Sequence, residues 1–187
     1  MLAGPGLARR TYQFPKVPGK AAHQAQVGAD KRGEGVTDRG EAAAVLMAWG
    51  PSLSVGVPFI DNEHQELLRI ANDLHDAMSA GKGQALLRSV LEELADYTKY
   101  HFAHEEAAMA EHGYPLLQEH RVKHADLLVM VAGLQARLRS GEACLTVEVF
   151  EFLKNWLTGH IQGRDRAFGT WLAHQGVAAV PAPSIPG

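Results

Sequence analysis

The chain has 187 residues, of which 46% are hydrophobic, so it can build a sizeable core and is not a wholly disordered protein. Its net charge of −3 argues against a protein that coats nucleic acid, and its single cysteine excludes a disulfide framework. No apolar run reaches the roughly 18 residues that a membrane-spanning helix needs, so we expect a cytoplasmic protein without a membrane span.

The start of the chain differs in composition from the rest. Residues 1–40 contain seven glycines and carry seven basic against three acidic side chains, a charge of +4 that leaves −7 for residues 41–187. They show no apolar periodicity and no apolar stretch typical of a secretion signal. We expect residues 1–46 to be disordered, or to precede a true start at Met47; a targeting segment and an ordered arm are the alternatives.

Apolar residues at helical spacing predict four helices after Met47. Asp61 is a good N-cap for the first helix, and glycines or prolines end each of the first three. Because the helices have similar lengths and short connections, we expect an all-α, antiparallel up-down-up-down four-helix bundle over residues 47–175. The four helices are predicted at 61–80, 84–111, 117–138 and 146–174. A flexible tail is predicted at 176–187.

Candidate metal ligands occur in every predicted helix, and the ten histidines of the chain exceed its methionines, phenylalanines or tyrosines. One candidate lies in the first helix, an i,i+4 pair lies in each of the second and third, and two candidates five residues apart lie in the fourth. Taken singly, each has a bland alternative as a surface or core residue. Together they predict a metal site inside the bundle. In chain order they are His64, His101, Glu105, His120, His124, His160 and Asp165.

The pair in the fourth helix conflicts with regular helical geometry. On an ideal α-helix five residues turn about 500°, which would point His160 and Asp165 about 140° apart. A single wide turn of about 4.4 residues would reduce this angle to about 50°. Gly159 and Gly163 weaken the regular helix and so lower the cost of distortion. On spacing alone this is therefore the weakest of the pairs. If both residues reach one metal centre, as the resemblance described next implies, we predict an i→i+5 turn within residues 157–166.

These motifs resemble the hemerythrin family, and particularly the bacterial hemerythrins. The matching segments are MAWGPSLSVGVPFIDNEHQELL, HFAHEEAAM, GYPLLQEHRVKHADLL and WLTGHIQGRD. The resemblance implies a non-haem centre of two iron ions per chain with a hydroxo or oxo bridge, in which Glu105 and Asp165 also bridge the ions and the five histidines are terminal ligands. It assigns three histidines to a saturated iron and leaves His64 and His101 on the iron with an open position for O₂.

The resemblance also implies a function, which is reversible O₂ binding for storage, delivery or buffering by a protein that is not an enzyme. A diiron redox enzyme and a sensor of O₂ or iron are the alternatives. We expect a monomer that binds O₂ and no nucleic acid, with an O₂-consuming enzyme as a candidate recipient.

Residues next to the ligands receive weaker expectations. His104 lies three residues after His101, so spacing alone does not exclude it, but the family pattern makes it a bystander. Trp156, one turn before His160, should lie on the side that faces the site. Ile60 and Leu68, one turn either side of His64, are candidate walls of an O₂ pocket.

Overall fold

The structure is a computed structural model that describes residues 46–141, 145–177 and 180–183, and within them its only regular elements are helices. We expected residues 1–46 to be disordered, and residues 1–45 of this segment lie outside the described part. In the described part, no helix combines the length and apolar character needed to cross a membrane. The elements are α1 (Pro58–Ser79), α2 (Gln84–Glu111), α3 (Leu117–Ser140), α4 (Val147–His160), η1 (Ile161–Asp165) and α5 (Arg166–His174).

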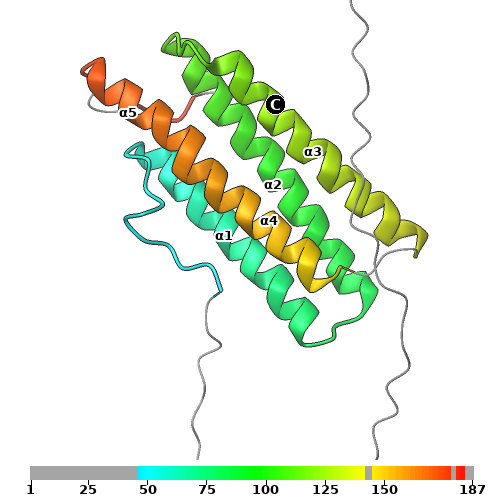
Figure 1. Cartoon of the computed structure of the whole chain (residues 1–187). Coiled ribbons are helices and arrows are strands. Elements are labelled where there is room, and N and C mark those ends of the chain that lie inside the picture. The colour runs from blue at the N-terminus through cyan, green and yellow to red at the C-terminus, as the bar shows by residue number, and fades with distance from the viewer. Residues whose placement is uncertain (1–45, 142–144, 178–179, 184–187) are drawn as a thin grey trace, which may run out of the picture. The chain divides into compact units, whose positions relative to one another are not determined.

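Four helical rods lie side by side in Figure 1. The first three rods are α1, α2 and α3, and the fourth is the continuous succession of α4, η1 and α5. Contacts between the first two rods run in opposite directions along the chain. Glu63 of α1 contacts His101 of α2, whereas Arg69, further along α1, contacts Glu93, which is earlier in α2. Because the connections between the following rods are short, each rod runs antiparallel to the one before it. The predicted antiparallel four-helix bundle is confirmed.

Helix α1 begins at Pro58, three residues before the predicted N-cap Asp61. Proline is favoured at the first helical position because its missing N–H would have no partner there. Asp61 instead accepts hydrogen bonds of 2.7 Å from the Ser54 hydroxyl and from the Val55 N–H, and so holds the preceding loop against the first turn. The N-cap prediction was wrong because an acidic residue suits both positions equally well in sequence.

The wide turn predicted in the fourth rod is confirmed. Residues Ile161–Asp165 form a π-helix between α4 and α5. As a result His160 Nε2 lies 3.1 Å from Asp165 Oδ1, a proximity that regular α-geometry would not allow. Gly163 lies inside this turn, as its low helix propensity favours.

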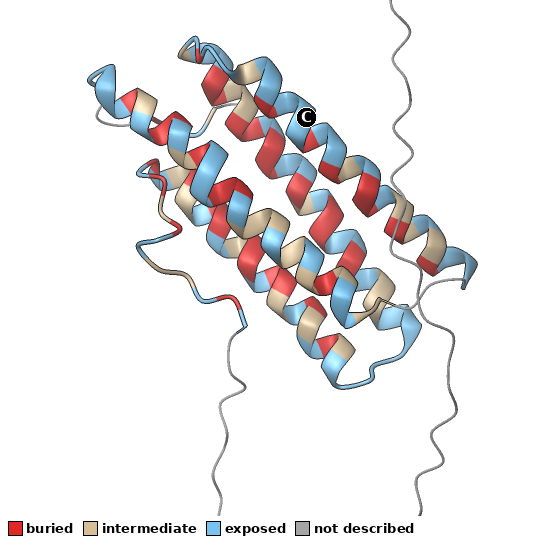
Figure 2. Ribbon diagram, viewed as in Figure 1, coloured by how far each residue is buried: buried red, intermediate tan, exposed pale blue. Residues whose placement is uncertain are grey.

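Buried residues lie mostly on the faces that the helices turn toward one another, as the colours of the ribbon show (Figure 2). Most are apolar, such as Leu67, Leu74 and Phe168, but one part of the core is built from ionisable side chains. Burying such groups costs folding free energy unless each finds a partner. Their arrangement therefore demands an explanation beyond packing.

The described chain enters the bundle at Met47. Its side chain is buried, whereas that of Leu46 is exposed. The Met47 N–H donates to Asn72 Oδ1 over 3.0 Å, and the Asn72 amide donates back to the Met47 carbonyl over 3.1 Å. Met47 is thus tied to α1 by a pair of hydrogen bonds.

Removal of residues 1–46 should leave the bundle intact, because these described contacts begin at Met47. We expect an unchanged helical circular-dichroism spectrum and a change in unfolding free energy, measured in urea, within about 0.5 kcal/mol. Removal of residues 1–50 is the matched control and should cost about 2 kcal/mol or more, since it deletes a buried methionine and its hydrogen bonds. Equal effects of the two truncations would contradict this boundary.

The loop before α1 also packs on α5. Arg166 donates to the carbonyls of Ser52 and Ser54, and Gly169 lies directly against the Val55 backbone. A side chain at position 169 would overlap the Val55 carbonyl oxygen. Glycine is therefore required here by close approach.

Replacing Gly169 by alanine should destabilise the protein by about 1–3 kcal/mol through this overlap, although alanine is the better helix former. Gly159→Ala is the matched control, since a Cβ there meets nothing within 4 Å and should stabilise by about 0.5–1 kcal/mol. Thermal unfolding of both variants measures the difference. A stabilising Gly169→Ala would show that the loop is not held against α5.

Candidate metal centre

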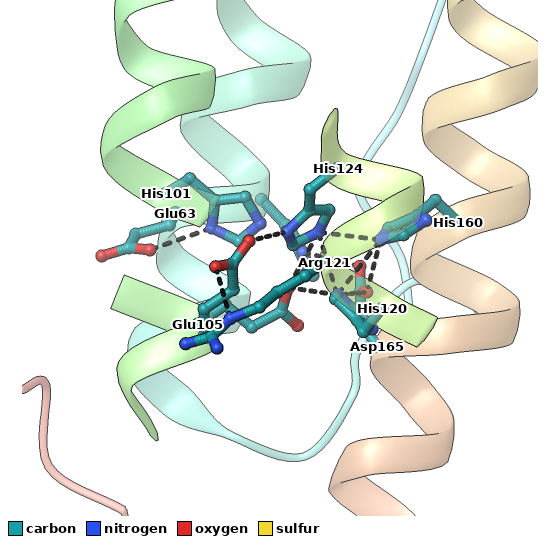
Figure 3. A network of polar contacts seen from close by, with 10 residues as sticks. Glu63, His101, Glu105, His120, Arg121, His124, His160 and Asp165 are labelled. Carbon is teal, nitrogen blue, oxygen red and sulfur yellow. Dashed lines mark hydrogen bonds and ion pairs between the residues drawn. The ribbon is translucent and has the colours of Figure 1, made fainter. Parts of the chain in front are cut away.

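All seven predicted ligand residues converge inside the bundle and are buried, with exposures of 0–7%. Their candidate donor atoms form two groups, each with its atoms within 4.8 Å of one another. We call the first group the five-residue subsite and the second the three-residue subsite; Asp165 belongs to both. Figure 3 shows most of these side chains pointing toward a common centre from different rods. The five-residue subsite is Glu105, His120, His124, His160 and Asp165, and the three-residue subsite is His64, His101 and Asp165.

Three imidazoles face one another in the five-residue subsite. The Nε2 atoms of His120 and His124 are 2.9 Å apart, those of His124 and His160 are 3.0 Å apart, and those of His160 and His120 are 3.3 Å apart. Two nitrogen donors bound at right angles to one ion at about 2.1 Å would be about 3.0 Å apart. The three rings thus present their nitrogens as one face of a metal coordination sphere.

The Asp165 carboxylate is divided between the two subsites. Its Oδ1 lies 3.1 Å from His160 Nε2 and 3.5 Å from His120 Nε2, whereas its Oδ2 lies 3.2 Å from His64 Nε2. Glu105 presents one oxygen, Oε2, to His120 at 3.0 Å and to His124 at 3.4 Å. Asp165 thus presents one oxygen to each of two neighbouring positions, which is the arrangement that a bridging carboxylate requires.

Several of these buried atoms have no hydrogen-bond partner in the described structure: both ring nitrogens of His64, Oε1 of Glu105 and both oxygens of Asp165. The short distance from His64 to Asp165 is therefore an electrostatic contact without hydrogen-bond geometry. Each unsatisfied buried group costs about 1–3 kcal/mol. Divalent metal ions would satisfy them, and an imidazole and carboxylate donor set suits iron, zinc or manganese.

The protonation of the centre follows from burial and from the facing carboxylates. Burial lowers the pKa of His124 to about 4, so its ring is neutral at pH 7. Burial would also lower the pKa of His101 and of His120, but hydrogen bonds to carboxylates and the nearby negative charges outweigh it and raise both above the ordinary value. The facing rings of His160 and His64 hold the pKa of Asp165 well below its usual range despite burial.

Two glutamates that the sequence analysis missed orient two of the candidate ligand rings. Glu63 Oε2 accepts a hydrogen bond of 2.9 Å from His101 Nδ1, and Glu106 Oε1 accepts one of 2.9 Å from His124 Nδ1. A proton on Nδ1 leaves the Nε2 lone pair directed into the site. Each glutamate adjoins a ligand in sequence, and consecutive helical residues point about 100° apart, so the neighbour of a ligand faces the next helix. That adjacency is the signal that was available.

His104 belongs to neither subsite, as expected, but it is more than a bystander. It is buried, and its Nδ1 lies 2.6 Å from Glu63 Oε1, so Glu63 is held between two histidines. The Tyr100 ring contacts the other side of His104, with centroids 4.0 Å apart. A line of contacts thus runs from His101 to the exposed Tyr100.

Aromatic rings stack on two of the three histidines of the five-residue subsite. Trp156 stacks on His160 with centroids 4.5 Å apart and an interplanar angle of 10°, which confirms that it faces the site. Phe102 stacks on His124 with centroids 3.4 Å apart. Ile60 and Leu68, which lie four residues before and after His64 in the sequence, are both buried. Their role as walls of an O₂ pocket stays a prediction.

Comparison with known proteins shows which family and which solved structures this chain is similar to. A family model, the hemerythrin HHE cation binding domain, matches residues 55–172. Bacteriohemerythrin of Stenotrophomonas maltophilia (strain R551-3) is 35% identical over 123 residues, which are 66% of this chain and 79% of that protein. Bacteriohemerythrin of Methylococcus capsulatus (strain Bath) is 31% identical over 129 residues, which are 68% of this chain and 98% of that protein.

Solved structures agree. Wild-type hemerythrin superposes with a TM-score of 0.64 at 30% identity, covering 72% of this chain and 99% of that one. A hemerythrin variant superposes with a TM-score of 0.66, also at 30% identity, covering 69% of this chain and 98% of that one. With the family model matching well over half of its length, and with a buried cluster of metal-ligand residues inside a four-helix bundle, the chain belongs to the hemerythrin family.

Proposed function

We propose that the chain binds O₂ reversibly at a non-haem diiron centre held by the seven converging residues, and so stores, delivers or buffers O₂. The observation that carries this proposal is the division of Asp165, with one carboxylate oxygen facing His160 and the other facing His64. A site for a single ion would not need oxygens on both sides. Membership of the hemerythrin family supports the O₂ part of the proposal, because the resemblance to bacterial hemerythrins implies O₂ binding.

The two subsites supply unequal numbers of protein donors. His120, His124 and His160 would hold one iron ion, and His64 and His101 the other, with Glu105 and Asp165 between the ions. Two bound ferrous ions would supply the electrons on which reversible O₂ binding depends. The three-residue subsite offers fewer donors, so it is the side with room for O₂.

The surrounding residues keep the histidines able to bind iron and keep water away from part of the centre. Glu63 and Glu106 fix the proton of a ligand imidazole on Nδ1, which keeps Nε2 free to ligate. The rings of Trp156 and Phe102 cover two other faces of the histidine cluster and exclude water there. Such a dry wall should slow oxidation of the iron by keeping water and anions away.

Cycling the reduced protein between argon and air tests the proposal. We expect two iron ions per chain and a visible absorption band that appears in air and disappears under argon over repeated cycles. Asp165→Ala should abolish the band, because it removes the carboxylate shared by the two subsites. His174→Ala, at an exposed histidine outside both subsites, is the matched control and should behave as the unchanged protein. One-way oxidation in a single exposure would instead favour a redox enzyme.

Acid should release the iron. His101 and His120 have raised pKa values, so without metal they hold their protons to a pH above the ordinary 6.5, and metal must displace those protons. Iron binding should therefore release protons, and affinity should fall as the pH falls. His124, with a pKa of about 4, competes for protons only in stronger acid. Iron retained after gel filtration between pH 7.5 and 4 measures the effect; retention independent of pH would contradict the ligand set.

A further inference from the structure

The two subsites are not equivalent, and we propose that they fill in a fixed order. The five-residue subsite takes the first metal ion and forms a stable one-ion protein, and the three-residue subsite takes the second ion more weakly. This order rests on the proposed diiron centre, but it concerns how the chain's own residues take up metal. It follows from three differences between the subsites.

The first difference is preorganisation. In the five-residue subsite the three Nε2 atoms already lie 2.9–3.3 Å apart, close to the spacing of about 3.0 Å for neighbouring donors on one ion. Oxygens of Glu105 and Asp165 lie 3.0 Å and 3.1 Å from two of these nitrogens. An ion can therefore enter with little movement of its ligands.

The second difference is the support of the rings. Each subsite has one ring oriented through Nδ1 by a glutamate, and in the three-residue subsite this is His101 with Glu63. The other rings of the five-residue subsite also make polar contacts through Nε2. Neither nitrogen of His64 has a hydrogen bond, and its ring meets that of His101 edge-on with centroids 4.7 Å apart. Packing and the electrostatic contact with Asp165 hold His64, so ligation there must fix a ring that no hydrogen bond has oriented.

The third difference is charge. The first ion gains both direct carboxylates, Glu105 and Asp165, and neutralises them. The second ion then shares the same two carboxylates and is repelled by the first, since ions in two-metal sites are only about 3.5–4 Å apart. The remaining buried carboxylate on this side is Glu63, which acts through His101. Glu63 should therefore matter mainly for the second ion.

Native mass spectrometry of the full metal-free chain, titrated with Co²⁺ at pH 7.5, tests the order. It counts chains that carry no ion, one ion and two ions at each addition. Two identical, independent positions would leave about half of the chains with one ion at one equivalent of Co²⁺, whereas a 100-fold difference in affinity would leave about 80%. We expect the one-ion form to dominate at one equivalent and to give way to the two-ion form only at higher Co²⁺.

A matched pair of variants assigns the two steps. Glu63→Gln and Glu106→Gln each remove one negative charge from a residue that orients a ligand ring, and each keeps the side-chain shape. We expect Glu63→Gln to weaken the second step about 10–100-fold and leave the first unchanged, and Glu106→Gln to weaken the first step by a similar factor. His64→Ala provides a second check if Glu63→Gln does not fold, since it should bind one ion with unchanged first-step affinity.

The outcomes separate this order from the diiron centre itself. Direct conversion of the metal-free to the two-ion form, or a weakened first step in Glu63→Gln or His64→Ala, would overturn the order while leaving the two-ion centre in place. Failure of the unchanged protein to bind a second Co²⁺ ion at any concentration would overturn both. A dominant one-ion form together with the expected pattern in the variants would establish the order.

Discussion

The centre depends on one constraint, which is that the carboxylate of Asp165 and the ring of His160 must meet although five residues separate them on one helix. The π-turn over Ile161–Asp165 satisfies this constraint and brings the two side chains to 3.1 Å. From that position Asp165 contacts α1 through His64 and α3 through His120. A local widening of one helix thereby joins three rods of the bundle at one buried carboxylate, and it makes the two subsites neighbours.

The buried charges explain how such a polar cluster fits inside a hydrophobic bundle. Two ferrous ions, Glu105, Asp165 and a bridging hydroxide would leave a small positive charge in the core. Glu63, buried on the side of His101, supplies a further negative charge, and Glu106 supplies another beside His124. Glu106 in turn pairs with Arg121 at 3.1 Å near the surface. Each orienting glutamate thus balances charge as well as fixing a ring, which offsets the cost of desolvation.

The sequence predicts what depends on periodicity and spacing. The four rods follow from apolar repeats, and the bounds of α2 agree with the predicted 84–111. The π-turn was predictable because the family resemblance requires both His160 and Asp165 to reach one centre, whereas regular helical geometry would point them apart. The orienting roles of Glu63 and Glu106 depend on which helix lies alongside, and this is not encoded in the spacing within one helix. The start of α1 at Pro58 was missed for a related reason, since the role of Asp61 depends on the loop folded over it.

In the proposed centre, weak metal binding and an open position for O₂ have a common origin. A subsite with five protein donors holds its ion firmly but leaves little of the coordination sphere for anything else. The three-residue subsite gives up donors, and with them affinity, on the side where a small ligand must enter. Glu63 offsets part of that loss of metal affinity without occupying a position on the ion. It makes His101 a stronger metal ligand through the hydrogen bond to Nδ1, and it adds negative charge nearby. The buried His104 holds Glu63 in place from its other oxygen, so the chain stabilises its open position by contacts that leave it open.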